Sequence, residues 1–230
     1  MAVLFAKGKV IYMINSNIRK LSLSGWLKDK DSKSYETSLK LQKFLLLYES
    51  FAKISGEQPD FSHLRGYKRG PVFSNVWGDY TKERVQFDKV AIQAYEQNKD
   101  EINSERATIC DFIVGTMSEK ELSDFTHEMN LWKSKEKRIM AGEYSVTLDE
   151  SDFNKHDENM ICLLSEMYPI DMINNSTIIS TDCNYFVFNK KDVPKQTEQH
   201  FDTLSTLSEQ ENLHNPVFVE IDEKGILVID

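Results

Sequence analysis

Cysteine is scarce in this sequence of 230 residues, and the three that occur lie far apart. Cys110, Cys162 and Cys183 form neither a CxxC pair nor an even-numbered set, which argues against a disulfide framework and a cysteine-based zinc module. No run of about 18 apolar residues occurs, so we expect no membrane span. Lys7 and Lys9 interrupt the apolar N-terminal stretch, and we therefore expect a cytoplasmic protein.

Glycine and histidine are also too few for the common catalytic motifs. The 9 glycines include no phosphate-binding loop followed by lysine and no dinucleotide fingerprint. The 5 histidines are scattered, and none forms an HExxH pair. A polar cluster surrounds His156 and Asp157, but it is more typical of a solvated helix face than of a metal site. We therefore expect no enzyme, no cofactor and no bound metal.

Charge is distributed unevenly along the chain. The net charge is -9, yet residues 1–90 carry 16 Lys and Arg against 9 Asp and Glu, whereas residues 91–230 carry 12 against 28. Two interpretations stay open: the halves neutralise each other across an internal interface, or one face attracts a partner of opposite charge. The pI near 5.2 argues against a general affinity for nucleic acid.

A helical pattern dominates the first part of the chain. Between Thr37 and Ile54 apolar residues recur at spacings of three and four and fill more than one face, which predicts a buried core helix. Gly56 and then Pro59 are expected to end it. Ser118 and Glu121 have the spacing of a capping box, which predicts a helix reaching about His127.

The residue pattern predicts a change from helices to strands near Pro169. Further helices are expected around residues 10–23, 71–80, 82–101, 109–117 and 151–167, with an exposed polar loop over residues 28–34. Strands are expected over residues 177–179, 185–188, 217–221 and 225–229, the last two forming a hairpin. The sequence thus predicts a mainly α fold, α+β overall, with a helical domain over residues 1–170 and a β-containing extension over residues 171–230.

A basic segment precedes the helix expected to begin at Pro71. Three cations and an aromatic residue lie beside that predicted helix N-terminus, where free N–H groups favour anions. Either a phosphate or an acidic protein surface would satisfy these charges. Aromatic and arginine side chains are the usual anchors of protein interfaces. The candidate partner-binding residues are Arg65, Tyr67, Lys68, Arg69, Trp77 and Trp132.

Three segments in series carry a family resemblance. Residues 40–48 read K-L-Q-K-F-L-L-L-Y, residues 67–77 contain a G-P-V turn, and residues 122–133 contain L-S-x-x-T-H with a tryptophan nearby. In this order and spacing they resemble the Panacea family, the SocA-like antitoxin domain of bacteria and their phages. The resemblance extends from about Leu39 to Lys137, and the C-terminal β element lies outside it.

The resemblance implies a compact helical domain that neutralises a cognate toxin by direct binding, within a toxin–antitoxin pair. In adaptor-type members it implies delivery of a toxin to a protease. A phage or prophage protein that targets a host protein, and a nucleic-acid-binding regulator, remain alternative functions. The oligomeric state stays open.

The residues of these motifs also have structural interpretations. Leu41, Phe44 and Leu45 are expected to be core packing, and Gly70 to be a turn residue. Thr126 and His127 are expected to form a buried hydrogen-bonded pair in preference to a catalytic dyad. The motifs therefore point to a fold more directly than to a site.

Overall fold

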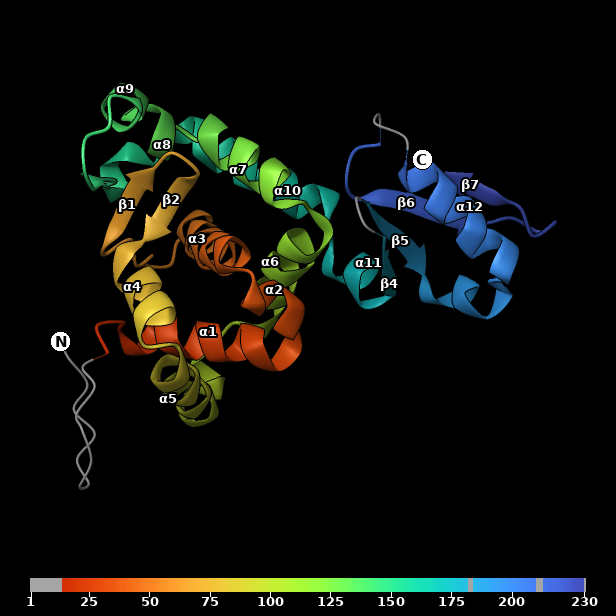
Figure 1. Ribbon diagram of the computed structural model, residues 1–230, viewed down its shortest axis with the longest axis horizontal. Helices are drawn as coiled ribbons and strands as arrows, with labels where there is room; N and C mark the ends of the chain where they lie inside the picture. Colours follow the sequence, from red (N-terminus) through yellow and green to blue (C-terminus); the bar gives the residue numbers. More distant parts are fainter. Residues whose placement is uncertain (1–13, 182–183, 210–212, 230) are drawn as a thin grey trace.

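The computed structural model describes residues 14–181, 184–209 and 213–229 (Figure 1). These residues form a mainly helical structure with two small sheets, which confirms the predicted mainly α fold with some β structure. The larger part contains α1 (Ile18–Lys30), α2 (Ser32–Glu36), α3 (Ser38–Ile54), α4 (Ser74–Lys82), α5 (Arg84–Gln97), α6 (Ser104–Thr116), α7 (Glu119–Glu128), α8 (Asn130–Lys133), α9 (Glu136–Met140), α10 (Lys155–Met167) and α11 (Ile170–Asn174). Short 3₁₀ helices occupy Lys99–Glu101, Glu150–Asp152 and Lys190–Lys195.

Helix α3 is the centre of the helical body. Figure 1 shows it surrounded by α1, α4, α6 and α7, and Phe44 and Leu45 have no exposed surface. A helix that is covered on all sides must be apolar around most of its circumference, as the sequence pattern of α3 is. Gly56 follows its end with a φ of +75°, which a glycine adopts without strain. The predicted core helix and its glycine stop are confirmed.

Side-chain caps fix several helix boundaries. The predicted capping box is confirmed, because Ser118 accepts from the Glu121 amide at 3.2 Å and Glu121 accepts from the Ser118 amide at 2.8 Å. The exposed loop predicted over residues 28–34 is wrong. Helix α1 continues to Lys30, and Asp31 caps α2 by accepting from the Ser34 amide at 3.0 Å. The predicted start of a helix near Val10 lies outside the described residues.

A three-stranded sheet contains the first residues of the helix predicted over residues 71–80. Strands β1 (Leu64–Tyr67), β2 (Gly70–Phe73) and β3 (Val146–Thr147) are ordered β2-β1-β3, and β1 pairs antiparallel with both neighbours. Tyr67 lies opposite Gly70, so the turn between them has two residues. Because Pro71 continues this hairpin in an extended strand, helix α4 begins only at Ser74. The prediction of Pro71 as a first helical residue was therefore wrong.

The C-terminal element consists of a four-stranded sheet and one helix. Its strands are β4 (Ser176–Ser180), β5 (Tyr185–Asn189), β6 (Val217–Ile221) and β7 (Leu227–Ile229), in that order across the sheet. The predicted hairpin is confirmed, because β6 and β7 pair antiparallel. Strands β5 and β6 pair in parallel and need a crossover, within which lies α12 (Glu198–Ser208). This helix was not predicted from the sequence, and its only buried side chain is Leu204.

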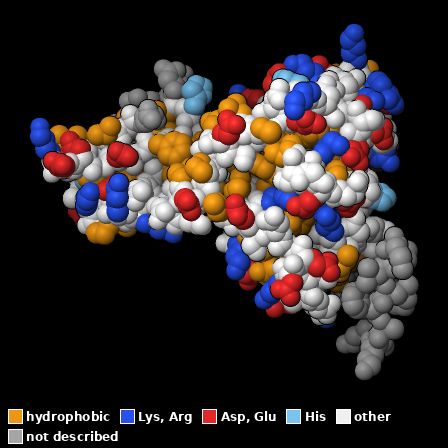
Figure 2. Space-filling view, turned by 180° about the vertical axis from the view of Figure 1, so that it is seen from behind, with side chains coloured by type: hydrophobic (Ala, Val, Ile, Leu, Met, Phe, Trp, Pro, Cys, Tyr) orange, Lys and Arg blue, Asp and Glu red, His pale blue; other side chains and the backbone are white. Residues whose placement is uncertain are grey.

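The two faces of this C-terminal sheet have different partners. Phe186 and Phe188 pack with Leu204 in a small separate core, whereas Val187 joins the core of the helical body. Polar contacts supplement this junction: Asn215 donates to both carboxylate oxygens of Glu121 at 3.1 Å. Figure 2 shows apolar side chains gathered where the C-terminal element meets the helical body. The junction is thus both apolar and hydrogen-bonded.

Candidate functional site

The outer edge of β2 is closed by two polar side chains of helix α3. An edge strand exposes unpaired backbone N–H and C=O groups, and β2 is an edge of its sheet. Gln42 accepts a hydrogen bond from the Phe73 amide at 2.7 Å, and the Lys43 ammonium donates to the Pro71 carbonyl at 3.4 Å. Proline has no N–H that would need a partner. The strand edge is therefore bonded to the central helix.

Lys43 is a buried amine. Its exposed fraction is 1%, and its Nζ donates to the Arg69 carbonyl at 3.1 Å in addition to the Pro71 carbonyl. No carboxylate within the described ranges forms an ion pair with it. Burial alone lowers the pKa of Lys43 to about 7, because the low-dielectric surroundings disfavour its charged form. Near neutral pH this amine is therefore poised between its two protonation states.

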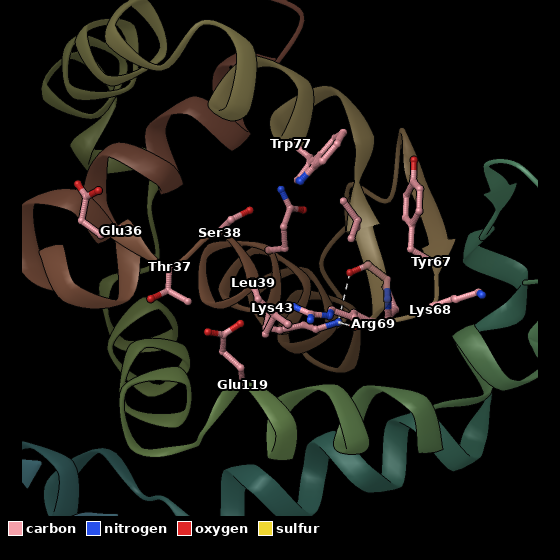
Figure 3. A pocket seen from close by; sticks show the side chains of 13 residues that line it. Glu36, Thr37, Ser38, Leu39, Lys43, Tyr67, Lys68, Arg69, Trp77 and Glu119 are labelled. Carbon is pink, nitrogen blue, oxygen red and sulfur yellow. Dashed lines mark hydrogen bonds between the residues drawn. The ribbon is translucent and has the colours of Figure 1, made fainter. Parts of the chain in front are cut away.

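Lys43 lines a pocket between α3, the β1–β2 hairpin and α4, which we call the hairpin pocket (Figure 3). Its volume is about 740 Å³, within the range of typical ligand pockets. Its wall combines apolar and aromatic side chains with cations on the hairpin and acids on the opposite side. The lining residues are Glu36, Thr37, Ser38, Leu39, Gln42, Lys43, Tyr67, Lys68, Arg69, Pro71, Val72, Trp77 and Glu119.

Four of the six predicted site residues meet at this pocket: Tyr67, Lys68, Arg69 and Trp77. Lys68 and Arg69 form the hairpin turn and are exposed. Across the described part of the chain, neither side chain pairs with an acid. The Trp77 ring, on α4, is 45% exposed. The hairpin pocket therefore combines free positive charge with an accessible aromatic ring.

The other two predicted residues lie elsewhere. Arg65 lines a separate cavity of about 300 Å³ that does not include the hairpin turn. Trp132 is only 3% exposed, so the prediction of an exposed interface anchor at this position was wrong. Its Nε1 donates to the Tyr67 carbonyl at 2.9 Å, and its ring centroid lies 4.1 Å from that of His127. Trp132 thus supports the hairpin from behind.

Thr126 and His127 do not form the predicted hydrogen-bonded pair. The Thr126 hydroxyl instead lies near the Leu122 carbonyl at 3.0 Å, as a donor to its own helix. Burial, and next the positive charge of Lys43, lower the pKa of His127. The His127 Nε2 atom is buried and has no hydrogen-bond partner among the described residues. The two residues therefore face the hairpin through separate contacts.

Gly70 allows the hairpin to approach α3. Its φ of +100° is rarely adopted by other residues. A Cβ at this position would lie 2.7 Å from the Thr126 hydroxyl and even closer to the Lys43 ammonium. Gly70 therefore has a steric role in addition to its predicted role in the turn, because the Lys43 amine occupies the space that a side chain at position 70 would need.

The cluster at His156 and Asp157 has a structural role. The Asp157 carboxylate accepts hydrogen bonds from the amides of Asn130 and Leu131, which begin helix α8. Burial raises the pKa of Asp157, and these backbone bonds oppose that effect. Within the described ranges, no group of three or more His, Cys, Asp or Glu side chains is arranged to hold a metal ion.

Gln42 and Lys43 were not among the residues predicted for this site. The K-L-Q-K segment contributed only its apolar residues and the family resemblance to the prediction. A signal for them was available in the sequence. Helix α3 is apolar on all sides, so its polar side chains must be buried and must find buried hydrogen-bond partners.

Comparison of the chain with protein-family models, with curated proteins and with solved structures gave no match. Among the described helices, none combines the length and the apolar character needed to cross a membrane.

Proposed function

We propose that this chain is an antitoxin-like binding module that holds a protein partner over the hairpin pocket. The observation that carries the proposal is the convergence of Tyr67, Lys68, Arg69 and Trp77 on one pocket of about 740 Å³. Aromatic and arginine side chains account for much of the binding energy at protein interfaces. The free cations would steer an acidic partner toward the pocket.

The nature of the partner rests on the resemblance to the Panacea family. That resemblance favours a cognate toxin, neutralised by direct contact. A host protein targeted by a phage or prophage protein, and a toxin passed to a protease by an adaptor, would use the same surface. A nucleic-acid-binding regulator would also use Lys68 and Arg69, but its affinity would fall steeply with salt.

Co-expression with the products of neighbouring genes tests the proposal. We expect one of them to inhibit growth alone, and this chain to restore growth and to co-purify with it as a stable complex. The paired change Lys68→Ala and Arg69→Ala should weaken that complex roughly thirtyfold or more, since a single hot-spot residue contributes about 2 kcal/mol. Thermal stability should stay near that of the parent, because exposed cations contribute little to it.

Arg65→Ala is the matched control, because Arg65 lies on the same hairpin but lines a different cavity. It should leave the complex unchanged. A folded Lys68→Ala, Arg69→Ala variant that binds and protects like the parent would move the contact surface elsewhere. Salt-sensitive retention of the parent on DNA, without any protein partner, would favour the regulator instead.

A further inference from the structure

Lys43 is as buried as a core side chain, but it carries an amine that can bind an anion. An ammonium has three donors, and main-chain carbonyls of Arg69 and Pro71 accept from it. A methionine of similar length would fill the same space without the cost of a buried charge. The remaining donor of Lys43 has no partner within the described ranges, and the side chain lines the hairpin pocket. A group bound in the pocket would therefore lie next to this side chain.

The charges around the pocket select the kind of anion. Lys68 and Arg69 lie on the hairpin side with Lys43, whereas Glu36 and Glu119 lie on the opposite side (Figure 3). Glu36 is already paired with Arg84 at 2.7 Å, but Glu119 has no ion pair within the described part of the chain. A polyphosphate would bring several negative charges toward these acids. A single carboxylate at the hairpin end would avoid that repulsion.

The apolar part of the pocket adds a second requirement. Leu39, Val72 and Trp77 form a surface that would bury an apolar side chain next to the anion. A carboxylate adjacent to an apolar residue occurs in an acidic protein segment but not in a nucleic-acid backbone. The mixed lining therefore favours a peptide.

We propose that the hairpin pocket binds an acidic side chain from a segment of the protein partner, with Lys43, Lys68 and Arg69 as its counter-charges and an adjacent apolar side chain against Trp77. This inference rests on the proposed function for its partner, but the pocket chemistry can be tested without one. A bound carboxylate stabilises the protonated amine, so binding takes up a proton at Lys43 near neutral pH.

The test is an NMR titration of the full chain carrying ¹³C-labelled lysine. The probes are two capped dipeptides, N-acetyl-leucyl-glutamate amide and N-acetyl-leucyl-glutamine amide, which differ only in one charged group. We expect the glutamate probe to raise the Lys43 titration midpoint by about one pH unit, which corresponds to a tenfold preference for the charged form. The glutamine probe should leave the midpoint unchanged, and Lys20 should not respond to either probe.

Variants and a third probe complete the test. Lys68→Gln with Arg69→Gln should reduce the difference between the two dipeptides in the Lys43 titration midpoint, because two of the three proposed counter-charges are then lost. Equal responses to both probes, or none, would overturn the inference. A larger response to inorganic phosphate than to the glutamate probe would also overturn it. A protein partner that binds despite an unresponsive Lys43 would leave the proposed function intact, whereas a responsive Lys43 without a partner would leave the pocket chemistry intact.

Discussion

Two lysines of the helical body are each 1% exposed, and they differ in whether carboxylates lie beside them. Lys20, on α1, contacts the buried carboxylate of Glu49 and lies 3.5 Å from Asp60. Arg19 joins the same network through Glu49 at 2.7 Å. Burial lowers the pKa of Lys20, but both carboxylates oppose this effect. Among the described residues, the partners of Lys43 are main-chain carbonyls alone.

The comparison separates two uses of a buried cation. Around Lys20 the charges balance internally, and the network links α1, α3 and the segment before β1. Around Lys43 no carboxylate of the described residues balances the charge, and the amine lies beside a pocket. A missing counter-charge is costly for stability but leaves room for a ligand to supply it. The predictions below test whether the two sites differ in this way.

The largest effect is expected from Glu49→Gln. The change leaves Lys20 buried without its closest carboxylate, and breaking a buried ion pair from one side costs about 3–5 kcal/mol. Urea unfolding monitored by circular dichroism measures this loss. Glu143→Gln, which removes an exposed pair with Arg138, is the control and should leave the unfolding midpoint unchanged. Similar small effects of both changes would show that the Lys20 network does not hold the fold.

A smaller loss is expected from Gly70→Ala. The new methyl group would force a left-handed backbone on alanine, at about 1–3 kcal/mol, and would collide with Lys43 and Thr126. Pro71→Ala is the neighbouring control, because the strand tolerates either residue there and its carbonyl still accepts from Lys43. Thermal unfolding compares the two. If Pro71→Ala costs as much as Gly70→Ala, the close packing of the hairpin on Lys43 is not what requires glycine.

The smallest effect is expected from Lys43→Met, which should change how the free energy of unfolding depends on pH. Folding lowers the pKa of Lys43 to about 7 from its ordinary value of 10.5. Between these values the unfolded chain binds the extra proton, so the parent gains stability as the pH rises. At pH 7 and below, the full cost of the buried charge is present. The variant lacks this slope, so its stability relative to the parent should fall from pH 7 to pH 9, on the order of 1 kcal/mol per pH unit.

Urea unfolding of both proteins at pH 6, 8 and 9 measures this difference, and comparing the two proteins cancels the contribution of titrating groups that do not interact with Lys43. A stability difference that does not change with pH would mean that Lys43 is protonated in the folded protein throughout. The contrast with Lys20 would then be lost.

Local sequence signals predicted the elements that are determined by interactions between residues close together in the chain. Helix α3 followed from its apolar spacing, α7 from the capping box at Ser118, and the last hairpin from a turn ending at Gly225. The polar run from Lys28 to Ser34 was predicted as a loop because its residues have weak apolar periodicity. The side chain of Asp31 and the packing of Tyr35 make it helical instead.

The sequence by itself determined a mainly helical fold with a buried central helix, because apolar spacing reports directly which residues must leave water. It also identified the hairpin cations and Trp77 as neighbours along the chain. Only the tertiary structure decided that Trp132 lies behind the hairpin, that Arg65 lies in another cavity, and that Lys43 is buried beside the turn without a carboxylate. These facts depend on contacts of the hairpin with α3 and α8, which are distant from it in sequence, and on the lack of a counter-charge among the described residues, which no local pattern encodes.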